Sequence, residues 1–198
     1  WGDFLVAEGL VDPEKHKALN EHYYHQYQRG QLDIDEYLSF ALGPMAGMTP
    51  EKLSALQDKF LKKHVEPILL DAAFDLLQAH RVKGDTLIII TATNTLVTQP
   101  IADRLGVEHL IGCEAELKDG RYTGKPEGVP SFGEGKVQRI KTWCAEHQTS
   151  LEGAVFYSDS HNDLPLLREV TQPIAVDPDD LLRAEAQQCG WKIISLRP

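Results

Sequence analysis

The stretch at residues 154–167, AVFYSDSHNDLPLL, limits the possible folds of this chain more than any other segment. Its first four residues form an apolar run too short for a helix, which predicts a buried strand. A polar segment with two aspartates, Asp159 and Asp163, follows, and leucines at helical spacing come after it. The pattern therefore predicts a strand, an acidic loop and a helix in direct succession.

The acidic loop is the first candidate for a functional site. In an open parallel sheet such a loop lies at the carboxyl end of its strand, where ligands bind, so we expect Asp159 and Asp163 to point into a crevice. Two carboxylates suit Mg²⁺, which takes oxygen ligands, keeps several waters and often binds substrate phosphate oxygens. The structural alternative is that Asp163 caps the following helix through backbone N–H groups that the first turn leaves unpaired.

Composition and charge narrow the range of partners. Hydrophobic residues make up 42% of the 198 residues, which is enough for a sizeable core. The formal net charge of -10 leaves little of the cationic surface that nucleic acids or anionic membranes require. We therefore expect neither as a partner, whereas a small anion can still bind at one local positive site.

The cysteines and the amino terminus bear on the cellular compartment. Cys113, Cys144 and Cys189 are far apart and lack CxxC spacing, which argues against a disulfide framework and against structural zinc. No signal peptide or long apolar segment is visible, so we expect a cytoplasmic protein. The chain begins at Trp1 rather than at a methionine, so we expect the gene product to contain an earlier segment.

Residues 1–81 show helical periodicity throughout. Several expected helices open with capping signals, among them Asp12-Pro13-Glu14 and Thr49-Pro50-Glu51, and the last one is expected to open at Pro67. We interpret residues 1–66 as a small helical domain. Residues 67–198 would form the main domain, with the helix after Pro67 leading into it.

After Gly84-Asp85 the pattern changes to that of a buried sheet. Residues 86–90 are rich in β-branched side chains, which is typical of a strand covered on both faces. Strands and helices then alternate, and Lys118-Asp119-Gly120 predicts a hairpin, because Asp-Gly tolerates the positive φ of a tight turn. Further strands are expected at residues 109–117, 121–124, 154–157, 173–176 and 191–196. The alternation predicts an α/β fold with a doubly wound, mainly parallel sheet.

Two more polar segments lie at expected strand ends or helix starts. Thr91-Ala92-Thr93-Asn94 follows the strand at 86–90 and precedes a helix, where a hydroxyl and backbone N–H groups can seat an anion. Lys136 opens a later helix, where the helix dipole disfavours a cation, so we expect anions nearby. The structural alternatives are an ordinary helix cap for the first segment and a solvated lysine for the second.

Taken in chain order, these segments resemble the second, third and fourth motifs of the haloacid dehalogenase (HAD) superfamily of phosphohydrolases. The motifs are a hydroxyl after one strand, a lysine opening a later helix, and Asp-x-x-x-Asp after the next strand. The carboxyl-terminal stretch Ile174-Ala175-Val176-Asp177-Pro178-Asp179 resembles the phosphoserine phosphatase-like subfamily IB. The resemblance implies a Rossmann-like HAD core with an inserted helical-bundle cap, the cap being residues 1–66.

The resemblance also implies an activity. It is that of a Mg²⁺-dependent phosphatase acting on a small phosphorylated metabolite through an aspartyl-phosphate, with phosphoserine and histidinol phosphate as candidate substrates and a monomer or homodimer as the assembly. The implied residues are Lys136, Thr91 and Asp159 for catalysis, Thr91, Ala92, Lys136 and Asn162 for binding the phosphate, and Asp159 and Asp163 for the metal, Asp163 through water.

One departure concerns the family's first motif, an apolar strand ending in Asp-x-Asp, whose first aspartate attacks phosphorus. Asp33-Ile34-Asp35 follows no strand and is expected to cap a helix. Asp177-Pro178-Asp179 comes after the acidic loop, and its proline suits a helix start. We therefore expect the motif upstream of Trp1. If it is absent, the alternative is a non-catalytic HAD-like binding or scaffold protein.

A response-regulator-like phosphoacceptor is a third class, which fits less well because such proteins lack an inserted helical bundle. Specificity would come from the expected cap, which carries an aromatic and partly cationic cluster. Its members are His22, Tyr23, Tyr24, His25, Tyr27 and Arg29. This cluster either meets a small phosphorylated amine or acid, or is simply core and surface of the bundle.

Overall fold

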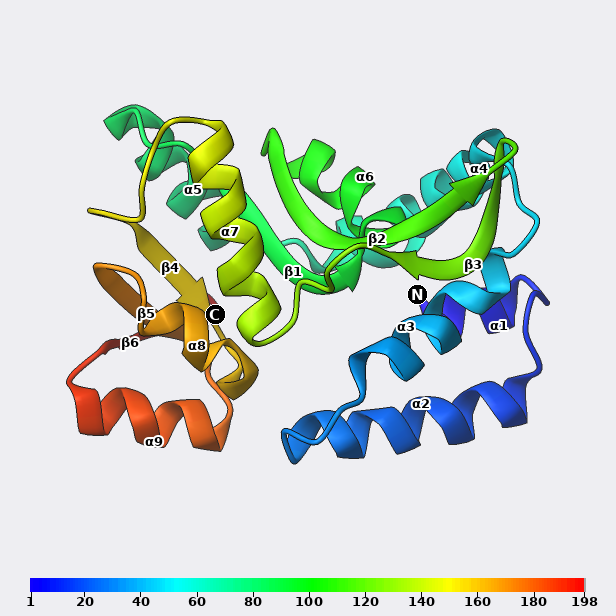
Figure 1. Ribbon diagram of the computed structural model, residues 1–198, viewed down its shortest axis with the longest axis horizontal. Coiled ribbons are helices and arrows are strands. Elements are labelled where there is room, and N and C mark those ends of the chain that lie inside the picture. The colour runs from blue at the N-terminus through cyan, green and yellow to red at the C-terminus, as the bar shows by residue number, and fades with distance from the viewer. Residues whose placement is uncertain (198) are drawn as a thin grey trace.

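A computed structural model describes residues 1–197, and its first part is helical (Figure 1). The helices are α1 (Gly2–Ala7), α2 (Pro13–Gln28), α3 (Ile34–Leu42), α4 (Pro50–Phe60) and α5 (Asp71–Lys83). Short turns lie between them: η1 (Gly43–Met45), η2 (Leu61–Val65) and η3 (Glu66–Ile68). The last helix starts later than predicted, because Pro67 lies within η3.

The predicted capping residues start these helices. Asp12 Oδ1 accepts a hydrogen bond from the backbone N–H of Lys15 at 2.8 Å. Asp33 Oδ1 accepts two such bonds at the start of α3, from Asp35 and Glu36. Asp33-Ile34-Asp35 is therefore a helix cap, as predicted.

The rest of the chain alternates strands and helices. The elements are β1 (Ile88–Asn94), α6 (Thr95–Leu105), β2 (His109–Lys118), β3 (Arg121–Glu127), α7 (Glu134–Glu146), β4 (Val155–Ser158), η4 (His161–Asp163), α8 (Leu164–Leu167), β5 (Gln172–Val176), α9 (Asp180–Cys189) and β6 (Lys192–Ile194). The α/β fold class is confirmed. The helix after the acidic loop is shorter than the leucine spacing suggests, with a single four-residue turn.

The strands form two three-stranded sheets, in the orders β1-β2-β3 and β4-β5-β6. All neighbours pair in parallel except β2 and β3. Those two form the predicted hairpin, in which Asp119 and Gly120 have φ of 50° and 71°, as a type I′ turn requires. Within the described residues β1 and β4 share no ladder, so the parallel sheet is divided between them.

Helix α7 joins the two sheets through its apolar face. Val137 and Ile140 are buried there, and they pack in one cluster with Ile90 of β1 and Phe156 of β4. The helix thus holds the carboxyl ends of β1 and β4 on one side of the molecule (Figure 1).

A second cluster joins the amino-terminal helices to the strands. Phe4, Leu38 and Leu53 are almost fully buried in it together with Val97 of α6 and Cys113 of β2. The apolar core of residues 1–66 is therefore continuous with part of the main domain, and the domain boundary at residue 66 stays a prediction.

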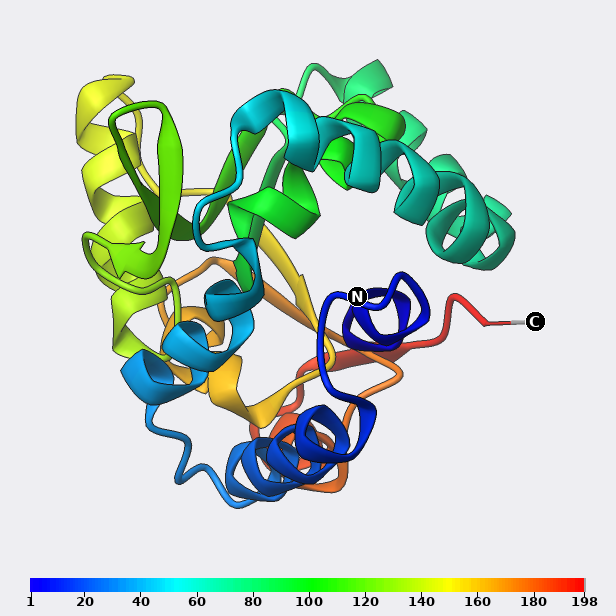
Figure 2. The ribbon, with the colours of Figure 1, turned by 90° about the vertical axis from the view of Figure 1, so that its right-hand side faces the viewer.

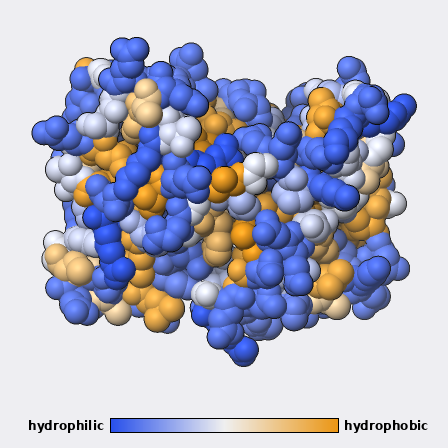
Figure 3. All heavy atoms as spheres, viewed as in Figure 1, coloured by the Kyte–Doolittle hydropathy of each residue, from blue (hydrophilic) through white to orange (hydrophobic). Residues whose placement is uncertain are grey.

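Helices α2 and α9 lie along the same edge of the molecule in both ribbon views (Figures 1 and 2). Hydrophilic residues cover most of the face drawn in Figure 3, with smaller apolar groups among them. No helix within residues 1–197 combines the length and the hydropathy that a membrane span needs. Cys113, Cys144 and Cys189 are free thiols, as predicted.

Candidate functional site

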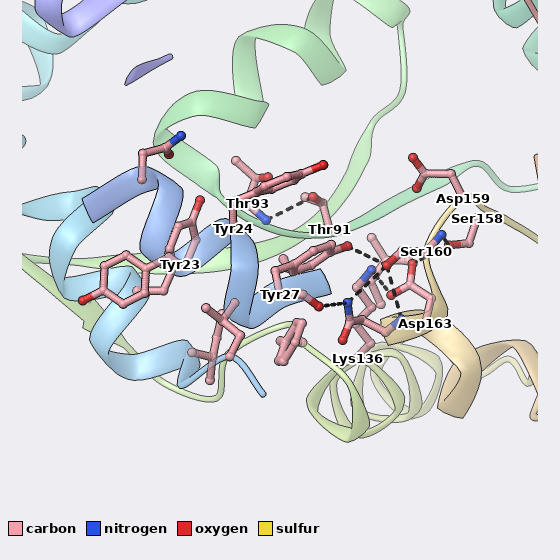
Figure 4. A pocket seen from close by; sticks show the side chains of 18 of the residues that line it. Tyr23, Tyr24, Tyr27, Thr91, Thr93, Lys136, Ser158, Asp159, Ser160 and Asp163 are labelled. Atoms are coloured by element: carbon pink, nitrogen blue, oxygen red, sulfur yellow. Dashed lines mark hydrogen bonds and ion pairs between the residues drawn. The ribbon is translucent and has the colours of Figure 1, made fainter. Parts of the chain in front are cut away.

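A cavity of about 380 Å³ lies where α2, β1, the start of α7 and the acidic loop meet (Figure 4). Every site residue that the sequence predicted lines it: Thr91, Ala92, Lys136, Asp159, Asn162 and Asp163. These residues come from three segments of the chain, and the fold brings them to one place.

Lys136 and Asp163 form a buried ion pair at this cavity. Lys136 Nζ lies 2.5 Å from Asp163 Oδ1, and the two residues are only 5% and 8% exposed. The hydroxyl of Ser158 donates to the other oxygen of Asp163 at 2.7 Å. Lys136 is therefore not a solvated lysine, and the Asp163 side chain makes no capping bond to α8. Both structural alternatives are wrong.

The close approach of α7 to the preceding loop places Lys136. A Cβ at Gly135 would lie 2.1 Å from the carbonyl oxygen of Pro130, so only glycine fits. The backbone N–H of Gly135 also donates to the oxygen of Phe132 at 2.8 Å. A glycine one residue before the lysine thus lets the first turn of α7 lie directly against the loop.

Replacing Gly135 with alanine is expected to move the first turn of α7 and Lys136 with it. A backbone atom cannot yield as a flexible side chain does, so we expect a loss of about 1–3 kcal/mol in the free energy of unfolding and reduced turnover. Thermal unfolding and phosphate release would be measured together. Gly43→Ala is the control, because nothing lies within 4 Å of a Cβ there and its φ of -47° is one that any residue adopts. Equal effects of the two changes would contradict this account.

Asp159 differs from Asp163 in its environment. Its residue is exposed, and its carboxylate has no hydrogen-bond partner among the described residues, as Figure 4 also shows. Its backbone oxygen accepts the N–H of Asp179 at 2.9 Å, which holds this part of the loop. The backbone of Asp159 is thus held by a hydrogen bond, whereas its carboxylate oxygens remain available to a ligand.

Thr91 lies in a bulge rather than at a helix start. Strand β1 continues to Asn94, and α6 begins only at Thr95, which corrects the prediction that the strand ends at Ile90 directly before a helix. Ile90 pairs with Ile111 but Asn94 pairs with Cys113, so β1 carries two more residues than β2 across this interval. Such an irregularity interrupts the ladder and redirects side chains. Thr91 Oγ1 accepts the N–H of Thr93 at 3.1 Å, which leaves its own O–H free to donate.

The acidic loop also contacts α2. The hydroxyl groups of Tyr27 and Ser160 lie 2.6 Å apart, and Asn162 Nδ2 donates to the backbone oxygen of Tyr27 at 3.4 Å. Burial raises the pKa of Tyr27, against the hydrogen bond to Ser160, so the phenol stays protonated. Asn162, which the resemblance implies as a phosphate-binding residue, thus contacts α2 and the loop itself, and these contacts orient the loop.

Asp179 supports the loop from the other side. Its Oδ2 accepts the backbone N–H of His161 and lies 2.8 Å from His161 Nδ1, while its Oδ1 accepts the N–H of Leu182. Burial alone would raise the pKa of Asp179, but the hydrogen bonds from Leu182 and His161 outweigh it and hold that pKa below the ordinary value. Asp177-Pro178-Asp179 therefore leads into a helix start, as predicted, and Asp179 also supports the loop.

The aromatic cluster predicted on α2 divides in two. Tyr23, Tyr24 and Tyr27 line the cavity, whereas His22, His25 and Arg29 do not. Sequence reasoning missed other lining residues, namely Asn20, Tyr37, Phe132, Tyr157, Ser158 and Ser160. Ser158 and Ser160 could have been predicted, because they flank Asp159 in the sequence. The other residues carry no sequence signal that marks them as part of a site.

The charges of the lining bear on a metal. The lining carries one cation, Lys136, and two carboxylates, Asp159 and Asp163, so its formal net charge is -1 among the described residues. Within residues 1–197 no group of three or more His, Cys, Asp or Glu side chains is arranged so that it could hold a metal ion by itself. Mg²⁺ binds through one or two carboxylates plus substrate phosphate, so the free Asp159 fits it, while Asp163 is engaged by Lys136 and Ser158.

Several known proteins resemble this chain in sequence. A model of the family described as haloacid dehalogenase-like hydrolase matches residues 1–168. A histidinol-phosphatase of Neisseria meningitidis is 39% identical over 201 residues, which span 100% of this chain and 90% of that protein. The phosphoserine phosphatase SerB1 of Mycobacterium tuberculosis is 32% identical over 157 residues, 79% of this chain but only 51% of that protein.

Solved structures resemble the chain in fold. A crystal structure from Bordetella pertussis, of a protein with unknown function, matches with a TM-score of 0.91 and 42% identity over 100% of this chain and 90% of the other. A substrate-bound phosphoserine phosphatase complex has the same fold, with a TM-score of 0.68 at 18% identity over 99% of this chain and 85% of the other. The chain belongs to the haloacid dehalogenase-like hydrolase family, and its named relatives place it with the phosphatases of that family.

Proposed function

We propose that this protein is a Mg²⁺-dependent phosphatase that hydrolyses the phosphomonoester of a small metabolite. One observation carries the proposal, namely a buried lysine and an unpartnered carboxylate, Lys136 and Asp159, lining the same cavity. The lining has a net negative charge, so a phosphate dianion needs a cation to enter. Mg²⁺, when bound, neutralises the phosphate and orients it for attack.

Each residue has a role that its contacts support. Asp159 would hold the metal directly, and Asp163 would act on it only through water, because both of its oxygens already accept hydrogen bonds. Lys136 would donate to the phosphate while Asp163 fixes its position. The free O–H of Thr91 and the backbone N–H groups around Ala92 would bind another phosphate oxygen.

We further propose an aspartyl-phosphate mechanism, with the attacking aspartate on a strand that precedes Trp1 in the native polypeptide. The sheet edges support this proposal, because β1 and β4 have no ladder to each other and both pack on α7. The isoleucines of β1, Ile88, Ile89 and Ile90, are only half-buried, although such a run is typical of a strand covered on both faces. A strand between β1 and β4 would pair with their free edges and pack its side chains beside these isoleucines.

The candidate substrates are histidinol phosphate and phosphoserine, which the names of two relatives suggest. The test is phosphate release by the full-length native protein from p-nitrophenyl phosphate and from a panel of phosphorylated metabolites, with and without Mg²⁺. Amino-terminal sequencing of the same sample should reveal an apolar run ending in Asp-x-Asp. A native protein that starts at Trp1 and releases no phosphate would instead indicate a binding or scaffold protein.

Replacing Thr91 with valine is expected to lower turnover only modestly, by about tenfold, because backbone donors around the bulge remain. The change is nearly isosteric, but it also removes the acceptor for the Thr93 N–H. Steady-state kinetics on p-nitrophenyl phosphate measure the effect. Thr98→Val on α6 is the control, since its hydroxyl bonds to the backbone oxygen of Asn94 outside the cavity. A loss of about 100-fold or more would contradict the secondary role of Thr91.

A further inference from the structure

The α2 side of the cavity is a stripe of one amide and three phenols. Asn20, Tyr23, Tyr24 and Tyr27 follow the spacing i, i+3, i+4 and i+7, so they share one face of the helix, and all four line the cavity. We call these four residues the tyrosine stripe. The helix buries none of its residues fully, and Tyr24 is 57% exposed. The stripe is therefore a surface of the cavity and not a packed core.

Aromatic neighbours hold the stripe in place. The rings of Tyr23 and Tyr37 meet edge to face at 5.7 Å, and Tyr27 lies 6.3 Å from Phe132. The hydroxyl of Tyr27 reaches Ser160 in the acidic loop, so the stripe runs up to the residues proposed to bind phosphate (Figure 4). A leaving group attached to a phosphate at Lys136 would therefore lie against these rings.

The charges around the stripe favour one kind of leaving group. Lys136 is the sole cation of the described lining, and Asp163 already pairs with it. A carboxylate on the leaving group would lose its water without gaining a cation, which is unfavourable. A cationic group gains from the faces of tyrosine rings.

A second cavity of about 530 Å³ continues this environment. It shares Tyr24, Tyr27, Asp159 and Ser160 with the first and is also lined by Asp177, Asp179 and Asp180. Its lining has no lysine or arginine among the described residues, and its histidine, His161, is paired with Asp179. The negative field therefore extends beyond the stripe on the side away from Lys136.

From these observations we infer that the enzyme selects phosphate esters of amino alcohols that lack a carboxylate, with the tyrosine stripe as the surface that binds the leaving group. The inference rests on the proposed phosphatase function and deepens it. Phosphoserine is then a poor substrate, although a named relative acts on it. Histidinol phosphate is a good one, because it carries an ammonium group and an aromatic ring but no carboxylate.

The test compares O-phosphoserine with O-phosphoethanolamine, which differ only in the carboxylate, using the full-length protein with Mg²⁺. We expect kcat/KM to be at least about tenfold higher for phosphoethanolamine, and higher still for histidinol phosphate. Phosphoserine hydrolysed as efficiently as phosphoethanolamine, while p-nitrophenyl phosphate is also hydrolysed, would overturn this inference alone. No hydrolysis of any ester would overturn the proposed function, and the inference with it.

Variants of the stripe make the test specific. Tyr24→Leu should raise KM for histidinol phosphate roughly threefold to thirtyfold, whereas Tyr24→Phe, which keeps the ring, should not. His25→Leu is the matched control, because this neighbour on α2 lies outside both cavities. Asn20→Arg adds the missing cation and should raise the ratio of phosphoserine to phosphoethanolamine turnover. An unchanged ratio together with an unchanged KM in Tyr24→Leu would contradict the assignment of the stripe.

Discussion

Replacing Lys136 with methionine is expected to lower both turnover and stability by large amounts. The substitution keeps an unbranched chain of similar length but removes the charge, so Asp163 stays buried without its cation. Breaking a buried pair in this way costs about 3–5 kcal/mol. Turnover should fall by about 100-fold to 1,000-fold, because the phosphate also loses a buried and positioned donor.

Two further variants separate the loss of function from the loss of stability. Lys136→Met combined with Asp163→Asn removes both charges, so it should recover much of the stability but none of the activity. Lys141→Met is the matched control, since Lys141 lies on the same helix and pairs with Glu169 on the surface, where the two side chains are 56% and 42% exposed. A single Lys136→Met variant with normal turnover would show that this lysine does not act on the phosphate.

Replacing Asp159 with asparagine should abolish Mg²⁺-dependent turnover and leave the fold intact. The carboxylate is exposed and has no partner in the described residues, so the free energy of unfolding should change by less than about 0.5 kcal/mol. A metal ligand supplies several kcal/mol of transition-state stabilisation, so we expect a loss of about 100-fold or more. Titration of activity with Mg²⁺ and chemical denaturation measure the two quantities.

Asp180→Asn provides the comparison for Asp159. Asp180 is also an exposed acid near the loop, but it lines only the second cavity. Its replacement should leave the Mg²⁺ dependence unchanged. If both variants keep normal dependence on Mg²⁺, the metal is not held by Asp159.

The order of elements could be predicted from the sequence because local signals determine it. Asp12 and Asp33 mark helix starts by side chains that cap their own backbone, and Asp119-Gly120 marks a turn by its tolerance of positive φ. These interactions span only a few residues. They depend on the segment itself and not on the rest of the fold, so they can be recognised in the sequence.

Strand ends were less predictable, because pairing with another strand decides them. The polar sequence Thr91-Ala92-Thr93-Asn94 suggests a loop, yet β2 pairs with Asn94 and extends β1 past a bulge. The tyrosines of α2 were likewise predicted as part of one aromatic cluster, without a signal to show whether they contact a ligand or pack in the bundle. Only the packed structure distinguishes the lining of a cavity from a bundle core.

The candidate site depended on contacts over long distances in the sequence. Lys136 and Asp163 are 27 residues apart, and nothing local indicates that they form a buried pair. The order of motifs predicted that both belong to one site. That Asp163 serves Lys136 and Ser158 while Asp159 remains free follows only from the geometry.

The central claim is that Lys136 and Asp159 act on one phosphoryl group in the cavity of about 380 Å³ that α2 helps to line. A crystal structure of the full-length protein with Mg²⁺ and tungstate, a phosphate analogue, tests it most directly. We predict the anion within hydrogen-bond distance of Lys136 Nζ and the metal bound to an oxygen of Asp159. An anion bound elsewhere, or a metal that does not contact Asp159, would contradict the account.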